Sequence, residues 1–272
     1  RENTGEKEMP LNEKKITEAI IKRYTEKLLD HLKCDVVIVG AGPSGLVAAA
    51  KLAQAKWKTV VFEKRLSIGG GMWGGGMMMN EIVVQNMGKE ILDEFGVESV
   101  LSSKDYYTAD SIEAVCSIAA RAVKSGARIF NLIMVEDLII KNNRAEGVVI
   151  NWSTAEMSGL PIDPLSIESK FVVDATGHQA EIVRLLDRKV ETRLMTPTGK
   201  VEGERSLWTD KAEQATLDNT REVYPNVFVT GMCANATFGS YRMGPIFGGM
   251  LKSGEKVAGL ISSKLEKGEE SG

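Results

Sequence analysis

Cysteine and histidine are scarce in this sequence. Its 272 residues include only two histidines and three cysteines, Cys34, Cys116 and Cys233. An odd number of cysteines without C-x-x-C spacing argues against a disulfide framework and against a zinc knot. The same scarcity favours a protein of the reducing cytoplasm.

Long apolar runs are also missing. Near the amino terminus the longest stretch without a charge, residues 36–50, has 15 residues and contains glycine and proline, so it is too short and too broken for a membrane span. The first ten residues lack the apolar core of a secretory signal. The net charge of −3 gives no strong attraction to nucleic acid or to an anionic membrane. We therefore expect a cytoplasmic protein with neither as a partner.

What is present is an alternation of strand and helix patterns in an ordinary globular composition, 43% hydrophobic and 26% charged. Strands are predicted where β-branched residues run together, and helices where apolar residues recur every three or four positions. The predicted strands cover residues 36–39, 59–63, 128–134, 137–141, 147–152, 226–232 and 170–178, the last ending in a glycine turn. The predicted helices cover residues 13–32, 43–55, 83–95, 110–124 and 247–265.

This order predicts an α/β fold with a doubly wound, mostly parallel, dinucleotide-binding sheet of the flavoprotein-like Rossmann type. We expect residues 1–12 to form a mobile charged arm and residues 13–272 a single domain. A β-rich subdomain is expected as an insertion near residues 97–165. Residues 187–221 are polar and irregular, which we interpret as a loop or a lid.

A G-x-G-x-x-G pattern follows the first of these strands and opens the next helix. Gly40 would permit the tight turn, Gly42 would let a pyrophosphate approach the backbone, and Gly45 would let helix and strand pack closely. Glu63 ends the following strand, where its carboxylate can accept hydroxyl hydrogens from an adenosine ribose and would repel a 2′-phosphate. The pattern predicts a site for NAD or FAD rather than NADP, and the alternative is a packing turn without a ligand.

Residues 65–80, RLSIGGGMWGGGMMMN, combine six glycines with four methionines. Each glycine costs about 0.5–1 kcal/mol of backbone entropy against alanine, so the backbone there must approach something closely or adopt a positive φ. Arg65, Gly69, Gly70 and Gly71 can form a second turn on a pyrophosphate, as in many flavoproteins. The stretch MWGGGMMM is longer than a phosphate turn requires, and the alternative to a ligand role is a flexible loop whose methionines fill gaps in the core.

His178 follows a predicted buried strand, at the position where open α/β sheets bind ligands. Asp163, in the segment LPIDP shortly before that strand, could join it in binding a divalent metal such as Fe(II). Two ligands make a weak motif, and structural roles are the alternative. Asp174 is interpreted as fixing the turn, and His31 as closing the first helix, where a cation suits the helix dipole.

Arg242 comes just before the turn residues Met243, Gly244 and Pro245 and the last predicted helix. An arginine among turn residues, with a helix N-terminus behind it, makes a good clamp for a carboxylate or a phosphate. The alternative is a surface arginine in a loop.

Three stretches together, GGGMWGGG, DPLSIESKFVVDATGH and RMGPIFGGMLKSG, resemble the thiamine thiazole synthases, in particular their archaeal and anaerobe-type branch. The resemblance covers residues 16–265. It implies a homo-octamer with the dinucleotide-binding flavoprotein fold that consumes NAD instead of using it as a hydride carrier. The implied reaction joins the ADP-ribose part of NAD with glycine and sulfide, using Fe(II). Its product is an adenylated 4-methyl-5-ethylthiazole carboxylate, the thiazole precursor of thiamine.

By position, the resemblance also implies roles for individual residues. Asp163 and His178 would bind Fe(II), as ligands that can come from neighbouring subunits, and Arg242 would hold the glycine carboxylate. The ADP part of NAD would be held by Ser44, Glu63, Lys64 and Gly71, together with Gly40, Gly42, Gly45 and Gly70. The remaining positions of the binding set are Val135, Pro161, Ile162, Met232 beside the product, Met243 and Gly244.

One position departs from the family pattern. Eukaryotic relatives have, two residues before the Asp-Pro pair, a cysteine that gives up its own sulfur, and many archaeal relatives have a histidine there. Here the residue is Pro161, which can neither donate sulfur nor bind a metal. The resemblance therefore implies external sulfide and multiple turnovers, or a changed activity. Three other functions stay open: an FAD-dependent oxidoreductase, a ribose-phosphate isomerase, and a non-catalytic NAD-binding module.

Overall fold

An eight-stranded sheet forms the centre of the computed structural model, which describes residues 10–191 and 193–270. Parallel strands run through it in the order β11-β9-β1-β2-β6. Antiparallel strands extend it, with β10 beside β11 and the β7–β8 hairpin beside the first half of β9. The bounds are β1 (Lys33–Val39), β2 (Thr59–Glu63), β6 (Arg128–Asn131), β7 (Ile133–Lys141), β8 (Arg144–Trp152), β9 (Leu165–Asp174), β10 (Arg221–Tyr224) and β11 (Val227–Val229).

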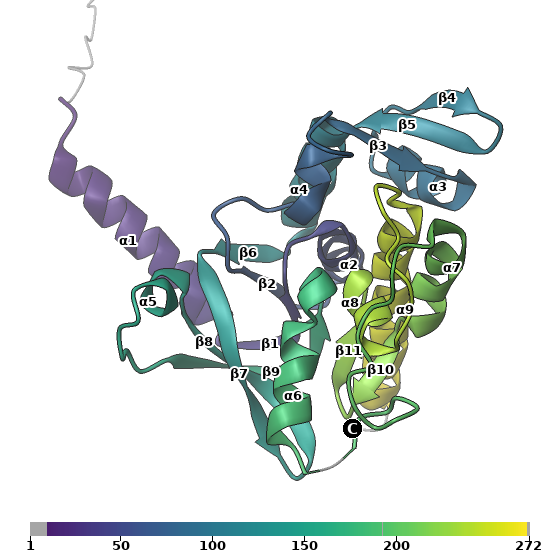
Figure 1. Ribbon diagram of the computed structural model, residues 1–272. Coiled ribbons are helices and arrows are strands. Elements are labelled where there is room, and N and C mark those ends of the chain that lie inside the picture. The colour runs from purple at the N-terminus through teal and green to yellow at the C-terminus, as the bar shows by residue number, and fades with distance from the viewer. Residues whose placement is uncertain (1–9, 192, 271–272) are drawn as a thin grey trace, which may run out of the picture.

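Both faces of this sheet are covered (Figure 1). In β1, Val36 and Ile38 pack into one hydrophobic core, and Val37 and Val39 pack into a second core on the opposite face. A strand buried on both sides explains the uninterrupted β-branched run. The helices of the first core are α2 (Pro43–Gln54), α3 (Asn86–Glu94), α4 (Ser111–Ser125) and α9 (Gly248–Glu270); those of the second are α6 (Glu181–Lys189) and α8 (Met232–Thr237). Within the described residues, no helix is both long and apolar enough to cross a membrane.

A smaller antiparallel sheet has the strand order β3-β5-β4 and lies to one side of the molecule (Figure 1). Its strands are β3 (Glu81–Val84), β4 (Val100–Ser103) and β5 (Tyr106–Asp110). The strands of residues 97–165 therefore divide between the two sheets, because β6, β7 and β8 belong to the larger one. After β5, the Asp110 carboxylate caps α4 by accepting hydrogen bonds from the backbone N of Ile112 and of Glu113, at 2.7 and 2.9 Å.

The helix α1 (Glu13–Asp30) projects from the body of the molecule (Figure 1). None of its residues is buried, and Tyr24 packs its ring on Phe130 and Trp152. His31, which follows α1, is only 4% exposed, and burial lowers its pKa. The expected closing role of His31 is confirmed, because its backbone N–H donates to the carbonyl oxygens of Leu28 and Leu29 at the end of α1. The lowered pKa favours the neutral ring over the cation that suits the helix dipole. Residues 1–9 of the predicted arm lie outside the described residues.

The predicted α/β class and its mostly parallel sheet are confirmed, with several local differences. The third predicted helix begins only at Asn86, because residues 81–84 are β-branched enough to form β3. The run over residues 128–134 is divided at Leu132, whose φ of 57° ends one strand before the next begins. The stretch 187–221 is not irregular throughout, since it contains α7 (Thr209–Asn219). Among the short helices not predicted from the sequence are α5 (Ser153–Met157), which follows β8, and α8, which begins at Met232 because the strand predicted over residues 226–232 ends at Val229.

Candidate functional site

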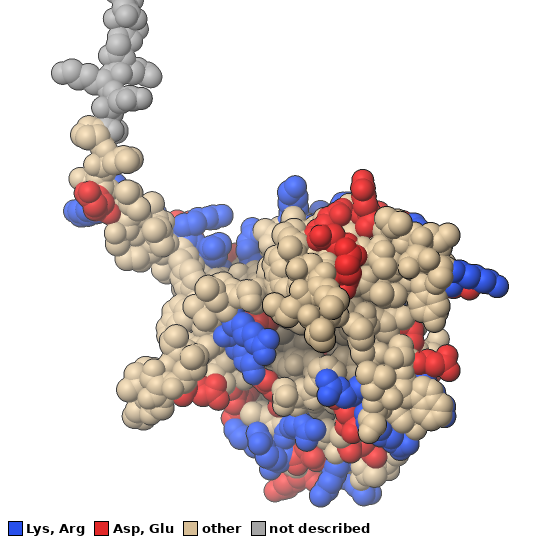
Figure 2. Space-filling model, turned by 45° about the horizontal axis from the view of Figure 1, so that its top comes forward, with Lys and Arg blue, Asp and Glu red and all other residues tan. Residues whose placement is uncertain are grey.

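A cavity of about 1050 Å³ opens at the carboxyl ends of β1, β2 and β9. This volume is at the upper limit of small-molecule sites, which span roughly 300–1000 Å³. The loops after these strands line the cavity, together with residues 204–207 and several residues of the stretch 242–250. Figure 2 shows that one face of the molecule is hollowed near its centre, with basic side chains beside the hollow.

The turn between β1 and α2 is tightly packed at two glycines and open at the third. Gly40 has a φ of +100°, and a Cβ there would lie 2.6 Å from the carbonyl oxygen of Ala175. A Cβ on Gly45 would overlap the carbonyl oxygen of Gly40. A Cβ on Gly42 would meet nothing within 4 Å, and Gly42 lines the cavity at the start of α2. The first N–H groups of a helix at this open position suit an anionic ligand.

A second glycine turn lies against the first. The backbone N of Gly69 donates to the carbonyl oxygen of Ala41 at 2.6 Å. Gly69 and Gly70 have φ values of +101° and +57°, which side chains disfavour. A Cβ on Gly70 would lie 3.2 Å from the Cα of Gly42. The two turns therefore face each other across bare backbone at the cavity wall.

The methionines of the same segment have two environments. Met72 is fully buried in the core, whereas Met77, Met78 and Met79 are exposed. Met72 and Met77 both line the cavity. The segment therefore contributes one core side chain and an apolar, solvent-facing group beside the cavity.

Glu63 fixes the backbone of both turns. Its Oε2 accepts a hydrogen bond from the backbone N of Ala41 at 2.9 Å, and its Oε1 accepts one from the backbone N of Arg65 at 2.8 Å. The side chain lines the cavity and is largely buried. Each carboxylate oxygen keeps a further lone pair that can accept a hydroxyl hydrogen. The neighbouring Lys64 forms an ion pair with Glu181, and both residues line the cavity.

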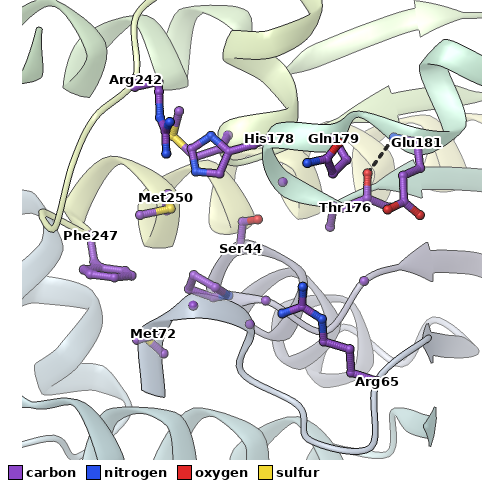
Figure 3. A pocket seen from close by; sticks show the side chains of 18 of the residues that line it. Ser44, Arg65, Met72, Thr176, His178, Gln179, Glu181, Arg242, Phe247 and Met250 are labelled. Carbon is purple, nitrogen blue, oxygen red and sulfur yellow. Dashed lines mark hydrogen bonds between the residues drawn. The ribbon is translucent and has the colours of Figure 1, made fainter. Parts of the chain in front are cut away.

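His178 points into the cavity from the short turn Gly177–Gln179 that follows β9 (Figure 3). Its Nδ1 lies 2.7 and 2.9 Å from the two carboxylate oxygens of Glu204. The His178 side chain is 44% exposed and the Glu204 side chain only 14%. Sequence reasoning missed Glu204, which stands 26 residues further along in the stretch interpreted as a loop or a lid. No motif or spacing connects the two residues.

Arg242 lies beside His178 in the cavity (Figure 3). Within the described residues, its guanidinium has no hydrogen-bond or ion-pair partner. Its backbone is held on both sides, because Arg242 N donates to Arg205 O at 3.2 Å and Trp208 N donates to Arg242 O at 3.1 Å. A guanidinium with all its donors available suits a carboxylate or a phosphate ligand.

The other sequence-predicted site residues divide into two groups. Most line the same cavity: Ser44, Gly71, Val135, Met232 and Gly244, with Gly40, Gly70 and Lys64. Gly45 and Met243 do not line it. Gly45 packs against the carbonyl oxygen of Gly40, and the Met243 side chain is 1% exposed near Thr216, whose Oγ1 lies 3.8 Å from the methionine sulfur.

Asp163 lies outside the cavity, together with Pro161 and Ile162. All three are exposed on the segment that leads into β9, whereas His178 follows the other end of that strand. At about 3.3 Å per residue, the 10 residues of β9 span roughly 33 Å. One chain therefore does not bring Asp163 and His178 together. Within the described residues, no group of three or more His, Cys, Asp or Glu side chains could hold a metal.

Asp174 is fully buried between β9 and α6. One of its oxygens accepts from the backbone N and the hydroxyl of Thr176, and the other from the backbone N of Ile182 and of Val183, both at 3.0 Å. Burial raises the pKa of this carboxyl. Its bonds to the first turn of α6 support the structural role expected for Asp174.

Comparison with known proteins gives four matches. Residues 17–247 match the model of the Thi4 family. A thiamine thiazole synthase from Methanothermobacter thermautotrophicus is 53% identical over 258 residues, covering 95% of this chain and 100% of that protein. One from Pyrococcus horikoshii is 52% identical over 256 residues, covering 94% and 99%. The crystal structure of Thermovibrio ammonificans THI4 has a TM-score of 0.92 and 52% identity, covering 95% of this chain and 100% of that one.

Proposed function

The chain belongs to the Thi4 family, and we propose that it is a thiamine thiazole synthase that makes an adenylated thiazole carboxylate from NAD, glycine and sulfide. The layout of the cavity carries the proposal. Two glycine turns with an acid lie on one side, and a histidine with an available arginine lies on the other. An enzyme that cleaves NAD and rebuilds its ribose needs both sets of residues in one cavity.

The glycine turns account for the nucleotide end. The open space at Gly42 and the N-terminus of α2 favour a pyrophosphate. Ser44 and Gly71 line the adjacent wall. Glu63 can accept hydrogen bonds from the adenosine ribose, and its charge disfavours a 2′-phosphate, which supports NAD over NADP.

Arg242 would bind the carboxylate of the substrate glycine. A guanidinium binds a carboxylate through two parallel hydrogen bonds, which fixes both its position and its orientation. Glycine held this way keeps its amino group available for condensation with the ketose carbonyl, which forms an imine and releases water. Apolar side chains such as Met77 and Met232 line the same cavity. They would keep out the water that hydrolyses imines.

His178 fits the role of an Fe(II) ligand. Its Nδ1 is paired with Glu204, and its Nε2 has no hydrogen-bond partner within the described residues. Histidines that bind metals commonly donate their other N–H to a carboxylate. When bound, Fe(II) supplies Lewis acidity and affinity for sulfide. Because Asp163 does not reach His178 in one chain, we propose that a second copy supplies it.

The surface around Asp163 supports such an assembly, which the family resemblance suggests is a homo-octamer. Met157, Leu160, Ile162 and Leu165 are exposed on the same stretch. A group of exposed apolar side chains favours burial against another chain.

Co-expression of Asp163→Ala chains with His178→Ala chains tests this arrangement. Each variant alone should be inactive, and the mixed assembly should regain activity, because some of its sites combine an intact Asp163 with an intact His178. A mixed assembly without activity would contradict a site shared between copies.

The cysteines support an external sulfur source. None of the three lines the cavity within the described residues. Cys34 and Cys233 are buried, and burial raises the pKa of Cys34 to about 12. Pro161 stands at the donor position. We therefore propose that dissolved sulfide supplies the sulfur and that each chain turns over repeatedly.

Anaerobic incubation with NAD, glycine, sulfide and Fe(II), followed by mass spectrometry, tests the whole proposal. We expect an adenylated thiazole carboxylate in molar excess over the chain, and none when sulfide is omitted. FAD released from the denatured protein would instead indicate a flavin-dependent oxidoreductase. Unchanged NAD under all conditions would indicate a binding protein without this activity.

A further inference from the structure

We propose that Glu204 is a positioning residue, which holds the His178 ring in the tautomer whose Nε2 can bind a metal. The part concerning metal binding rests on the proposed function, whereas the tautomer does not depend on it. The proposal also gives a role to residues 202–208, which lie within the stretch 187–221 that the sequence predicts to be a loop or a lid.

The contact itself fixes the tautomer. An ionised carboxylate can only accept hydrogen bonds, so the proton between Glu204 and His178 belongs to Nδ1 of the ring. In a neutral imidazole the other nitrogen, Nε2, then carries a lone pair. Glu204 is 14% exposed and has no other hydrogen-bond partner within the described residues, so His178 is the group that compensates its burial.

The backbone explains how Glu204 reaches this position. Residues 202–208 run alongside residues 236–242 and are joined to them by several hydrogen bonds. Gly203 N donates to Ala236 O at 2.9 Å, and Arg205 N donates to Ser240 O at 2.8 Å. These bonds flank Glu204 on both sides, so its backbone is fixed on the cavity wall.

The same segment also holds Arg242. Arg242 N donates to Arg205 O, and Trp208 N donates to Arg242 O. One stretch of backbone therefore fixes the orientation of His178 through a side chain and the position of Arg242 through the main chain. This arrangement sets the proposed metal ligand and the proposed glycine clamp relative to each other (Figure 3).

Nitrogen-15 NMR of the metal-free full chain, labelled at histidine and measured at alkaline pH, tests the tautomer directly. The chain has only two histidines, and the buried His31 serves as an internal reference. We expect His178 to carry its proton on Nδ1 in the wild type and to lose that preference in Glu204→Ala. Glu204→Gln should retain the preference, because its amide oxygen can still accept the hydrogen bond.

Titration of the full chain with Co(II), followed by visible absorption, tests the consequence for metal binding. Loss of an outer carboxylate partner commonly weakens metal affinity by roughly 10–100-fold, which is the decrease expected for Glu204→Ala. Glu204→Gln should fall between Glu204→Ala and the wild type, since a neutral acceptor bonds less strongly. Glu202→Ala is the matched control, because Glu202 contacts the backbone of Thr198 and not His178.

The outcomes separate the two proposals. Unchanged His178 tautomer in Glu204→Ala would overturn the positioning role, whatever happens to Co(II) affinity. Equal Co(II) affinity of His178→Ala and the wild type would instead overturn the metal site in the proposed function, while the tautomer measurement would still decide the role of Glu204. Thermal melting of each variant confirms that the comparison is made between folded proteins.

Discussion

Replacing Gly42 and Gly45 separately by alanine should separate nucleotide binding from folding. Both changes add one carbon to the same turn. At Gly45 the new Cβ would overlap the carbonyl oxygen of Gly40, whereas at Gly42 it would meet no atom within 4 Å. The φ of −74° and ψ of −179° at Gly42 are accessible to any residue, so alanine fits there without a change of backbone.

The expected effects on stability follow from these contacts. At Gly42, alanine is a poorer helix N-cap than glycine, by a few tenths to about 1 kcal/mol. It also reduces the entropy of the unfolded chain, which stabilises by about 0.4–1 kcal/mol, so the two terms nearly cancel. At Gly45 the overlap is with backbone that cannot rotate away, and overpacking of this kind costs about 1–3 kcal/mol. At about 2–4 °C per kcal/mol, Tm should fall by roughly 2–12 °C for Gly45→Ala and stay nearly constant for Gly42→Ala.

Gly42→Ala should weaken NAD binding although it leaves the stability of the protein nearly unchanged. The added methyl group would occupy the space through which a pyrophosphate approaches the turn, and we expect at least about tenfold weaker NAD binding, or about 1.4 kcal/mol. Calorimetric titration with NAD, without iron or sulfide, measures the affinity, and scanning calorimetry measures Tm. Wild-type NAD affinity in a folded Gly42→Ala protein would refute the placement of the pyrophosphate. A large decrease in Tm of that variant would contradict the finding that a Cβ at Gly42 meets no other atom.

Three further predictions concern other parts of the chain. Arg242→Lys keeps the charge but loses the bidentate geometry, so kcat/KM for glycine should fall by roughly 10–100-fold, a loss of about 1.5–3 kcal/mol; an equal loss of NAD affinity in a binding titration would contradict this. A thiol reagent should label one cysteine in the folded chain, Cys116, because Cys34 and Cys233 are buried; rapid labelling of a second would contradict it. Burial raises the pKa of Glu213, so the folded state binds this proton more tightly and loses stability as pH rises above the unfolded value of about 4.3. Glu213→Gln should therefore gain Tm relative to the wild type between pH 4 and pH 7, and a constant difference would argue against it.

The first β-α-β unit could be predicted because its signals are local. The run of β-branched residues before Gly40 and the acid at Glu63 each lie next to the element they specify. β3 and α7 could not be predicted in this way. β3 has only four residues and acquires its strand partner, β5, from a segment more than 20 residues away. α7 has only three buried residues, Ala212, Glu213 and Thr216, and one of them is an acid, so its apolar pattern is weak.

The candidate site shows the same limit more sharply. His178 could be selected from the sequence because it follows a buried strand, and Gly42 because of its spacing. Glu204 could not, since its importance comes from backbone pairing of residues 202–208 with residues 236–242, a segment about 34 positions later. The glycine density of residues 69–76 has a similar non-local cause. A Cβ on Gly70 would lie 3.2 Å from the Cα of Gly42, so bare backbone is required at Gly70, and only the folded chain shows which residue it meets.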